Sequence, residues 1–163
     1  MEETKIDIKK GIKFHKIVSN KFKTDLIAVF ITVPLQRDTI TYNALLPMVL
    51  RRGTNNIKTQ QDINKELENM YGASFDCGVD KNGDNQVMKF YLEILDNQYV
   101  LENEDILKQG LKLLIDIVCN PYIENNAFLK KYVDGEKQNL KQLIEEKNDN
   151  KARYALDRCI EEI

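Results

Sequence analysis

The sequence predicts an α+β fold in which a mainly antiparallel sheet is covered on one face by helices. Three observations lead to this prediction: strand-like runs occur in two pairs, a polar loop joins each pair, and stretches with helical periodicity follow each pair. The resulting order is two strands, two helices, two strands and three helices. With 163 residues, 42% of them hydrophobic, the chain suits a single domain, residues 1–163, with its own core.

The first strands are predicted at Lys13–Val18 and Asp25–Pro34, two apolar or alternating runs separated by a short polar segment. We expect them to pair as an antiparallel hairpin. The next helix is predicted to be capped by Asp38 and to continue through Arg52, because Gly53 suits the position just past a helix end. Its apolar face is expected to consist of Leu45, Leu46, Val49 and Leu50.

A second helix is expected directly afterwards. Thr59 and Asp62 are spaced as in a capping box, in which the first side chain caps the helix. Apolar residues then recur at helical spacing until Gly72, namely Ile63, Leu67 and Met70.

After Gly72 the hydrophobic residues recur at every second position, the spacing of a strand. Met88, Phe90, Leu92 and Ile94 alternate with polar residues and tyrosine, and the segment KNGDN at 81–85 has the composition of a hairpin turn. We therefore predict a second hairpin formed by Ala73–Val79 and Val87–Leu95.

Three helices are predicted in the last third of the chain. The first is Glu104–Cys119, which ends before Pro121 because proline disfavours helix at the preceding residue. Its apolar side is expected to carry Leu107, Leu111, Leu114 and Val118. Glu124–Lys147 and Asn150–Ile163 follow. Because the last helix has no terminating signal, we expect the chain to be an N-terminal fragment of a longer protein that continues with further strands.

The composition excludes several classes of protein. The 24 Lys and Arg residues against 26 Asp and Glu give a net charge of −2 without a basic block, so we expect no nucleic-acid partner. The longest apolar runs, Leu26–Leu35 and Leu111–Val118, are shorter than the roughly 18 residues that a membrane span needs, so no membrane association is expected. The acidic start is unlike a secretory signal, and the three cysteines are far apart, as in reduced thiols. These features predict a cytoplasmic protein.

Two stretches carry a resemblance to a known family. LLPMVLRRGTNNIKTQQDINKELENMYGASFD resembles a metal-binding helix with its Gly-Thr end, followed by the next helix and a Gly-led strand. GLKLLIDIVCNPYIENNAF resembles the helix, Asn-Pro turn and aromatic residue that precede a second metal-binding helix. Together with the order of the elements, they resemble the pitrilysin/insulinase family of zinc peptidases over Lys13–Ile163. The resemblance implies a metallopeptidase-like domain.

Active members of that family carry H-x-x-E-H on the first helix, since residues four apart share a face and two imidazoles then converge on zinc while the glutamate activates its water. Anchored on Gly53-Thr54, the three positions fall on Ala44, Pro47 and Met48. The third ligand of the family, a glutamate on the later helix, falls on Leu143 when Glu136 is aligned with the preceding acidic residue. None of these side chains suits a hydrolytic zinc, so we predict no metal, no cofactor and no catalytic residue.

Two features near this helix also argue against a hidden site. Pro47 removes a backbone donor and is expected to kink the helix. The only histidine, His15, lies in the predicted first strand and is expected to be an ordinary residue at the sheet surface, because a metal site needs at least three converging ligands.

The resemblance implies a catalytically inactive peptidase homologue. The resemblance implies that such members pair with an active homologue that carries H-x-x-E-H and help to hold an extended peptide. The sequence of this chain is similar to that of a non-catalytic partner that has been connected with modification of elongation factor P. In active members the peptide adds to the strand after the second helix. Here that strand is either an ordinary sheet strand or a site for strand addition, and it comprises Ser74, Phe75, Asp76, Cys77, Gly78 and Val79.

Two alternatives stay open at this point. The chain is a zinc-dependent peptidase whose ligands are substituted or supplied by a partner, or it is a scaffold that binds an unrelated protein. Bound zinc together with peptide cleavage would support the first alternative. A homologue with H-x-x-E-H encoded beside this chain would argue against the second.

Overall fold

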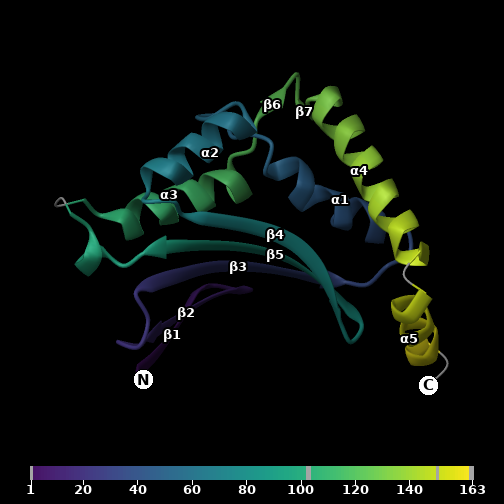
Figure 1. The fold of residues 1–163 in the computed structure, drawn as a ribbon, viewed down its shortest axis with the longest axis horizontal. Coiled ribbons are helices and arrows are strands. Elements are labelled where there is room, and N and C mark those ends of the chain that lie inside the picture. Colours follow the sequence, from purple (N-terminus) through teal and green to yellow (C-terminus); the bar gives the residue numbers. More distant parts are fainter. Residues whose placement is uncertain (1, 102–103, 150, 162–163) are drawn as a thin grey trace.

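The computed structural model describes residues 2–101, 104–149 and 151–161. It is an α+β fold, as predicted, with antiparallel strands and helices (Figure 1). The elements are β1 (Glu2–Lys9), β2 (Ile12–Val18), β3 (Thr24–Pro34), α1 (Ile40–Leu50), α2 (Gln60–Asn69), β4 (Ser74–Asn82), β5 (Asn85–Leu95), a 3-10 turn (Asn97–Tyr99), α3 (Ile106–Cys119), β6 (Ile123–Glu124), β7 (Ala127–Phe128), α4 (Lys130–Asp149) and α5 (Lys151–Glu161).

The central sheet has the strand order β3-β5-β4, and α1, α2 and α3 lie on one of its faces (Figure 1). The core forms between that face and the helices. The predicted alternation of β5 is confirmed, because Met88, Phe90, Leu92 and Ile94 are all buried. The predicted hairpin of β4 and β5 is also confirmed, with Gly83 and Asp84 at its turn between the paired residues Asn82 and Asn85.

The predicted opening hairpin is wrong. β2 pairs with β1, and β3 pairs with β5 instead of β2. The prediction omitted Glu2–Lys9, whose alternation is as regular as that of β2, and it overlooked the short turn at Lys10 and Gly11 between them. A two-residue connection favours pairing of the strands it joins, so β2 pairs with β1.

The first two helices begin differently. Thr59 is the N-cap of α2, as predicted, and its hydroxyl accepts a hydrogen bond from the Asp62 backbone N–H at 3.1 Å. By contrast, α1 begins after Thr39, not Asp38, and ends at Leu50 instead of Arg52. The reason is a turn before α1, in which the Gln36 carbonyl accepts hydrogen bonds from the N–H groups of Thr39 and Ile40 and places Asp38 within the turn.

The buried face of α3 also differs from the prediction. Leu114 is fully buried and Val118 packs against the core, as predicted, but Leu107 and Leu111 are exposed. Ile106, Leu113 and Ile117 join the core instead. Gly110 explains this rotation, since a Cβ there would lie 3.2 Å from side-chain atoms of Leu92 and Ile94. The helix therefore approaches β5 closely at its glycine, a contact that counting leucines does not reveal.

The helix predicted to begin at Glu124 begins at Lys130. The preceding residues form the small hairpin of β6 and β7, and Asn125 and Asn126 occupy its turn with φ of 52° and 60°. Asparagine tolerates this left-handed conformation, so Asn-Asn favours a tight hairpin turn over a helix start. The last helix is α5, while Asn150, Glu162 and Ile163 of its predicted range lie outside the described residues.

Candidate functional site

The positions aligned with the metal ligands lie on two neighbouring helices. Ala44, Pro47 and Met48 belong to α1, and Leu143 belongs to α4. α1 and α4 contact each other on the helix-covered side of the sheet (Figure 1). Pro47 is fully buried, Ala44 and Met48 are half-buried, and Leu143 is exposed by 51%.

A hollow of about 280 Å³ separates parts of α1 and α4. Its walls are mainly apolar, with Tyr42 and Leu45 from α1 and with Leu140 and Ile144 from α4. Leu143 does not line this hollow. Glu136, on an earlier turn of α4, instead pairs with Arg52 just after the end of α1.

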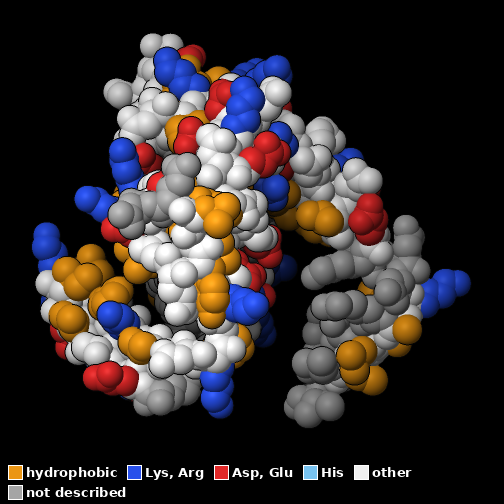
Figure 2. Space-filling view, turned by 60° about the vertical axis from the view of Figure 1, so that its left-hand side comes forward, with side chains coloured by type: hydrophobic (Ala, Val, Ile, Leu, Met, Phe, Trp, Pro, Cys, Tyr) orange, Lys and Arg blue, Asp and Glu red, His pale blue; other side chains and the backbone are white. Residues whose placement is uncertain are grey.

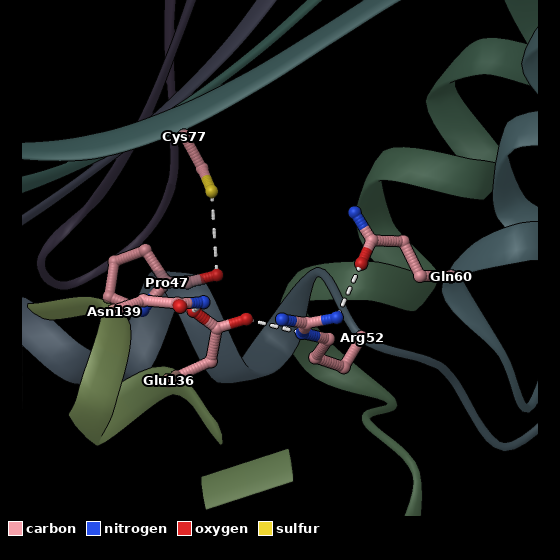
Figure 3. A network of polar contacts seen from close by, with 6 residues as sticks. All are labelled: Pro47, Arg52, Gln60, Cys77, Glu136 and Asn139. Carbon is pink, nitrogen blue, oxygen red and sulfur yellow. Dashed lines mark hydrogen bonds and ion pairs between the residues drawn. The ribbon is translucent and has the colours of Figure 1, made fainter. Parts of the chain in front are cut away.

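Glu136 is the centre of a polar network between α1, α2 and α4 (Figure 3). It is 3% exposed and forms an ion pair with Arg52, which follows the end of α1. Arg52 also donates to the Gln60 side-chain oxygen at 2.9 Å, and Asn139 donates to the second Glu136 oxygen at 3.0 Å. A buried carboxylate needs such partners, because an unpaired buried charge is strongly unfavourable.

The segment after α1 places Arg52 for this contact. Gly53 is buried, and a Cβ there would lie 2.5 Å from the Lys58 carbonyl oxygen, so the turn requires glycine. Thr54 is fully buried and its hydroxyl accepts from the Ile57 N–H at 2.9 Å. The Gly-Thr pair that resembles the end of a metal-binding helix therefore fixes the chain locally, without any metal.

Cys77 lies on the other side of Pro47. Its Sγ is 3.4 Å from the Pro47 carbonyl oxygen and points toward it (Figure 3). Burial raises the pKa of the Cys77 thiol to about 11, and the nearby Arg51 guanidinium only partly opposes this effect. The thiol is therefore protonated at neutral pH and is a poor nucleophile or metal ligand.

The residues at the aligned positions do not fit a zinc ion. A methyl group, a proline ring, a thioether and an aliphatic side chain offer no hard or borderline ligand set for a hydrolytic metal. Among the residues that the structure describes, no group of three or more His, Cys, Asp or Glu side chains could hold a metal. His15 is at the surface of β2, as expected, and its nearest acidic partner is Glu3 at 3.7 Å.

The pairing of Arg52 with Glu136 is not predicted from the sequence. The two residues are 84 positions apart, and neither helical spacing nor a local motif relates them. The sequence signal is that Arg52 lies in the stretch that resembles the first metal-binding helix and that Glu136 is the acidic residue aligned on the later helix.

The six residues of the candidate peptide-binding strand all lie in β4, at one edge of the central sheet. β4 pairs with β5 on one side, and within the described residues no strand pairs with its other side. Phe75, Cys77 and Val79 pack against the core, whereas Asp76 is exposed. The strand therefore has the open edge that strand addition requires.

Comparisons with known proteins place these observations in context. No protein-family model matches the chain. Over 153 residues, 94% of this chain, it is 37% identical to a Bacillus subtilis (strain 168) protein named "Probable inactive metalloprotease YmfF". This similarity supports the prediction of a degenerate peptidase homologue.

A solved structure gives the same fold. A conserved protein from Enterococcus faecalis V583 matches with a TM-score of 0.88 and 29% identity, over 94% of this chain. The chain spans 36% of the length of each of these two proteins. Among the described residues, no helix has the length and apolar composition needed to cross a lipid bilayer.

Proposed function

We propose that this chain is a peptidase-like domain, of the pitrilysin/insulinase type, that holds an extended peptide without cleaving it. The proposal rests on two observations about the same helices. α1 and α4 pack together, but the aligned ligand positions on them offer no metal ligand, namely Ala44, Pro47, Met48 and Leu143. The similarity to a protein named as an inactive metalloprotease supports it. The proposed location is the cytoplasm, where free thiols such as Cys77, Cys119 and Cys159 stay reduced.

The peptide is proposed to add to the open edge of β4. Strand addition uses backbone hydrogen bonds for affinity and needs no catalytic group. The test uses a fluorescent heptapeptide of alternating Val and Thr, N-methylated at every second residue in one of two registers. Only one set of alternate N–H groups faces the neighbouring strand, so one register should abolish binding while the other leaves it nearly unchanged. Equal effects of both registers would reject strand addition.

The second part of the proposal is a partner. A domain without a catalytic metal contributes to peptide cleavage only beside an active subunit, so we propose a heterodimer with a homologue that carries H-x-x-E-H. Permanent complexes of this kind bury on the order of 2,000 Å² or more. Light scattering of the mixed proteins should give the mass of the heterodimer, and the partner should cleave long peptides faster in the mixture. If the proteins stay separate and the partner cleaves equally well alone, the scaffold alternative replaces this part.

The zinc-dependent alternative has a direct test. The protein, prepared without metal and then incubated with zinc, is analysed for bound metal after gel filtration, both alone and with the H-x-x-E-H homologue. We expect no zinc with the isolated protein and no additional zinc in the mixture. Zinc retained together with peptide cleavage by the isolated protein would establish the alternative.

A further inference from the structure

The open edge of β4 is blocked locally by one of its own side chains. In an antiparallel pair, successive residues direct their backbone groups alternately toward the partner strand and away from it. The Cys77 N–H donates a hydrogen bond to the Asp76 Oδ1 at 2.8 Å, so it is directed to the open side of β4. The Asp76 carboxylate therefore occupies the position where a carbonyl of an added strand would accept that hydrogen bond.

Asp76 is available to an incoming cation. It is exposed, and among the described residues it forms no ion pair. The other exposed carboxylate in this strand, Asp80, is already paired with Lys89, which also lies 5.8 Å from the centre of the Tyr91 ring. The two aspartates thus differ: Asp76 caps the open edge and is influenced by Lys89 only at longer range, while Asp80 forms the short ion pair with that lysine.

We propose that Asp76 selects which peptides add to β4, favouring strands that carry Lys or Arg opposite it. A basic side chain draws the carboxylate into a cross-strand ion pair, and the Cys77 N–H is then released to bond the peptide backbone. A neutral strand displaces the carboxylate without offering it a partner, and an acidic strand adds repulsion. This proposal rests on strand addition at β4. In the absence of a peptide, the same carboxylate protects the edge from unspecific pairing, as charged side chains do on other edge strands.

The experiment compares three labelled heptapeptides that differ only at the central residue, which is Lys, Gln or Glu. Fluorescence anisotropy with the intact protein should give about threefold tighter binding for the Lys peptide than for the Gln peptide, and about threefold weaker binding for the Glu peptide. The difference should shrink when the salt concentration is raised, because the pair is exposed.

Asp76→Ala tests the role of the carboxylate. The variant should bind all three peptides with nearly equal affinity, and the Gln peptide should bind at least as tightly as it binds to the unmodified protein, because the Cys77 N–H is free. Asp84→Ala is the control, since it removes an exposed acid from the turn after the same strand, leaves the Asp80–Lys89 ion pair intact and should leave the preference for Lys unchanged.

The outcomes separate this proposal from the one on which it rests. If one N-methylation register abolishes binding but Lys, Gln and Glu peptides bind equally, strand addition stands and selection by Asp76 is wrong. Selection is also wrong if Asp76→Ala keeps the preference or if Asp84→Ala removes it. If neither the unmodified protein nor Asp76→Ala binds any of the peptides, both proposals fail together.

Discussion

Two regions of the molecule differ in how deeply they bury their apolar side chains. They are the contact between α1, α2 and α4 and the hairpin of β1 and β2. At the helix contact, Pro47 and Leu45 are buried and Glu136 has its charged partner. In the hairpin every residue is exposed, and the large apolar side chains Ile6, Ile8, Ile12, Phe14 and Ile17 are 43–59% accessible. Figure 2 shows the hairpin as a separate lobe at the lower left with hydrophobic side chains at its surface. The stability of this chain therefore rests on the helix layer and the central sheet, and an apolar pattern alone does not locate the core.

The strongest test of that comparison removes the same side chain from each region. Phe90 in β5 is fully buried, and Phe14 in β2 is 43% exposed. Phe90→Ala should lower the free energy of unfolding by about 3–5 kcal/mol, because it leaves a cavity in the core. Phe14→Ala should change it by less than about 0.5 kcal/mol. Urea unfolding followed by circular dichroism measures both, and similar losses would mean that the hairpin contributes to the core.

The second test breaks the polar network. Arg52→Met leaves the Glu136 carboxylate buried without its cation, and we expect a loss of about 2–4 kcal/mol, somewhat reduced because the Arg52 side chain is 30% exposed. Arg52→Met combined with Glu136→Leu removes both charges and should recover most of that loss. The double-variant cycle is measured by urea unfolding. A double variant as unstable as Arg52→Met would show that packing by the arginine stem, not charge pairing, holds these helices.

The two regions also show what sequence patterns predict well. The alternation of β5 and the Thr59 cap of α2 are local signals, and both are confirmed. The turn residues between β4 and β5 were equally informative. In each case, the physical cause lies within a few residues of its effect, so one segment of sequence contains it.

Two errors, the pairing of β2 and the start of α4, came from local turns that were overlooked. Others arose where distant contacts decide the structure, since the face of α3 depends on the close approach of Gly110 to β5. The Glu136–Arg52 pair joins residues 84 positions apart. For the candidate site, the unsuitable ligand positions could be predicted, whereas the polar network that accompanies them could not.

Helix capping gives a smaller effect with a matched control. Thr59 caps α2 through its hydroxyl, whereas Thr39 at the start of α1 makes no such cap. Thr59→Ala should cost about 1 kcal/mol, and Thr39→Ala should cost only a few tenths. Thermal unfolding in the same buffer compares them. A larger loss at Thr39 would indicate that its bond to the Gln36 carbonyl matters more than the cap of α2.

Cys77 allows the helix contact to be tested through thiol chemistry. Its pKa is raised to about 11, mainly by burial, whereas Cys119 is exposed. At about pH 8, iodoacetamide should modify Cys119 first and Cys77 at least about tenfold more slowly, because the thiolate is the reactive form. Since the folded state keeps the proton longer, the stability contributed by the neutral thiol is present below pH 9 and is lost as the pH rises toward 11. Mass spectrometry of the alkylated peptides measures the difference in reactivity. Urea unfolding of the unmodified protein against pH, compared with that of Cys77→Ala, measures the effect on stability.

The smallest effect is expected from restoring the metal ligands themselves. We predict that Ala44→His, Pro47→Glu, Met48→His and Leu143→Glu together create at most a weak zinc site. The side chains that orient metal ligands have no reason to be retained, and their absence typically costs 10–100-fold in metal affinity. In addition, Leu143 is half exposed, and the Arg52 cation, which follows α1 and pairs with Glu136 of α4, disfavours a second positive charge between these helices.

Isothermal titration with zinc measures this directly, and Arg52→Gln in the same background separates the two causes. If charge is the main obstacle, removing the guanidinium should raise zinc affinity severalfold, because repulsion falls and Glu136 is released. If geometry is the main obstacle, affinity should stay low in both backgrounds. Tight zinc binding and peptide cleavage by the four-residue variant with Arg52 intact would mean that the helix contact has kept the geometry of a metal site despite the loss of its ligands.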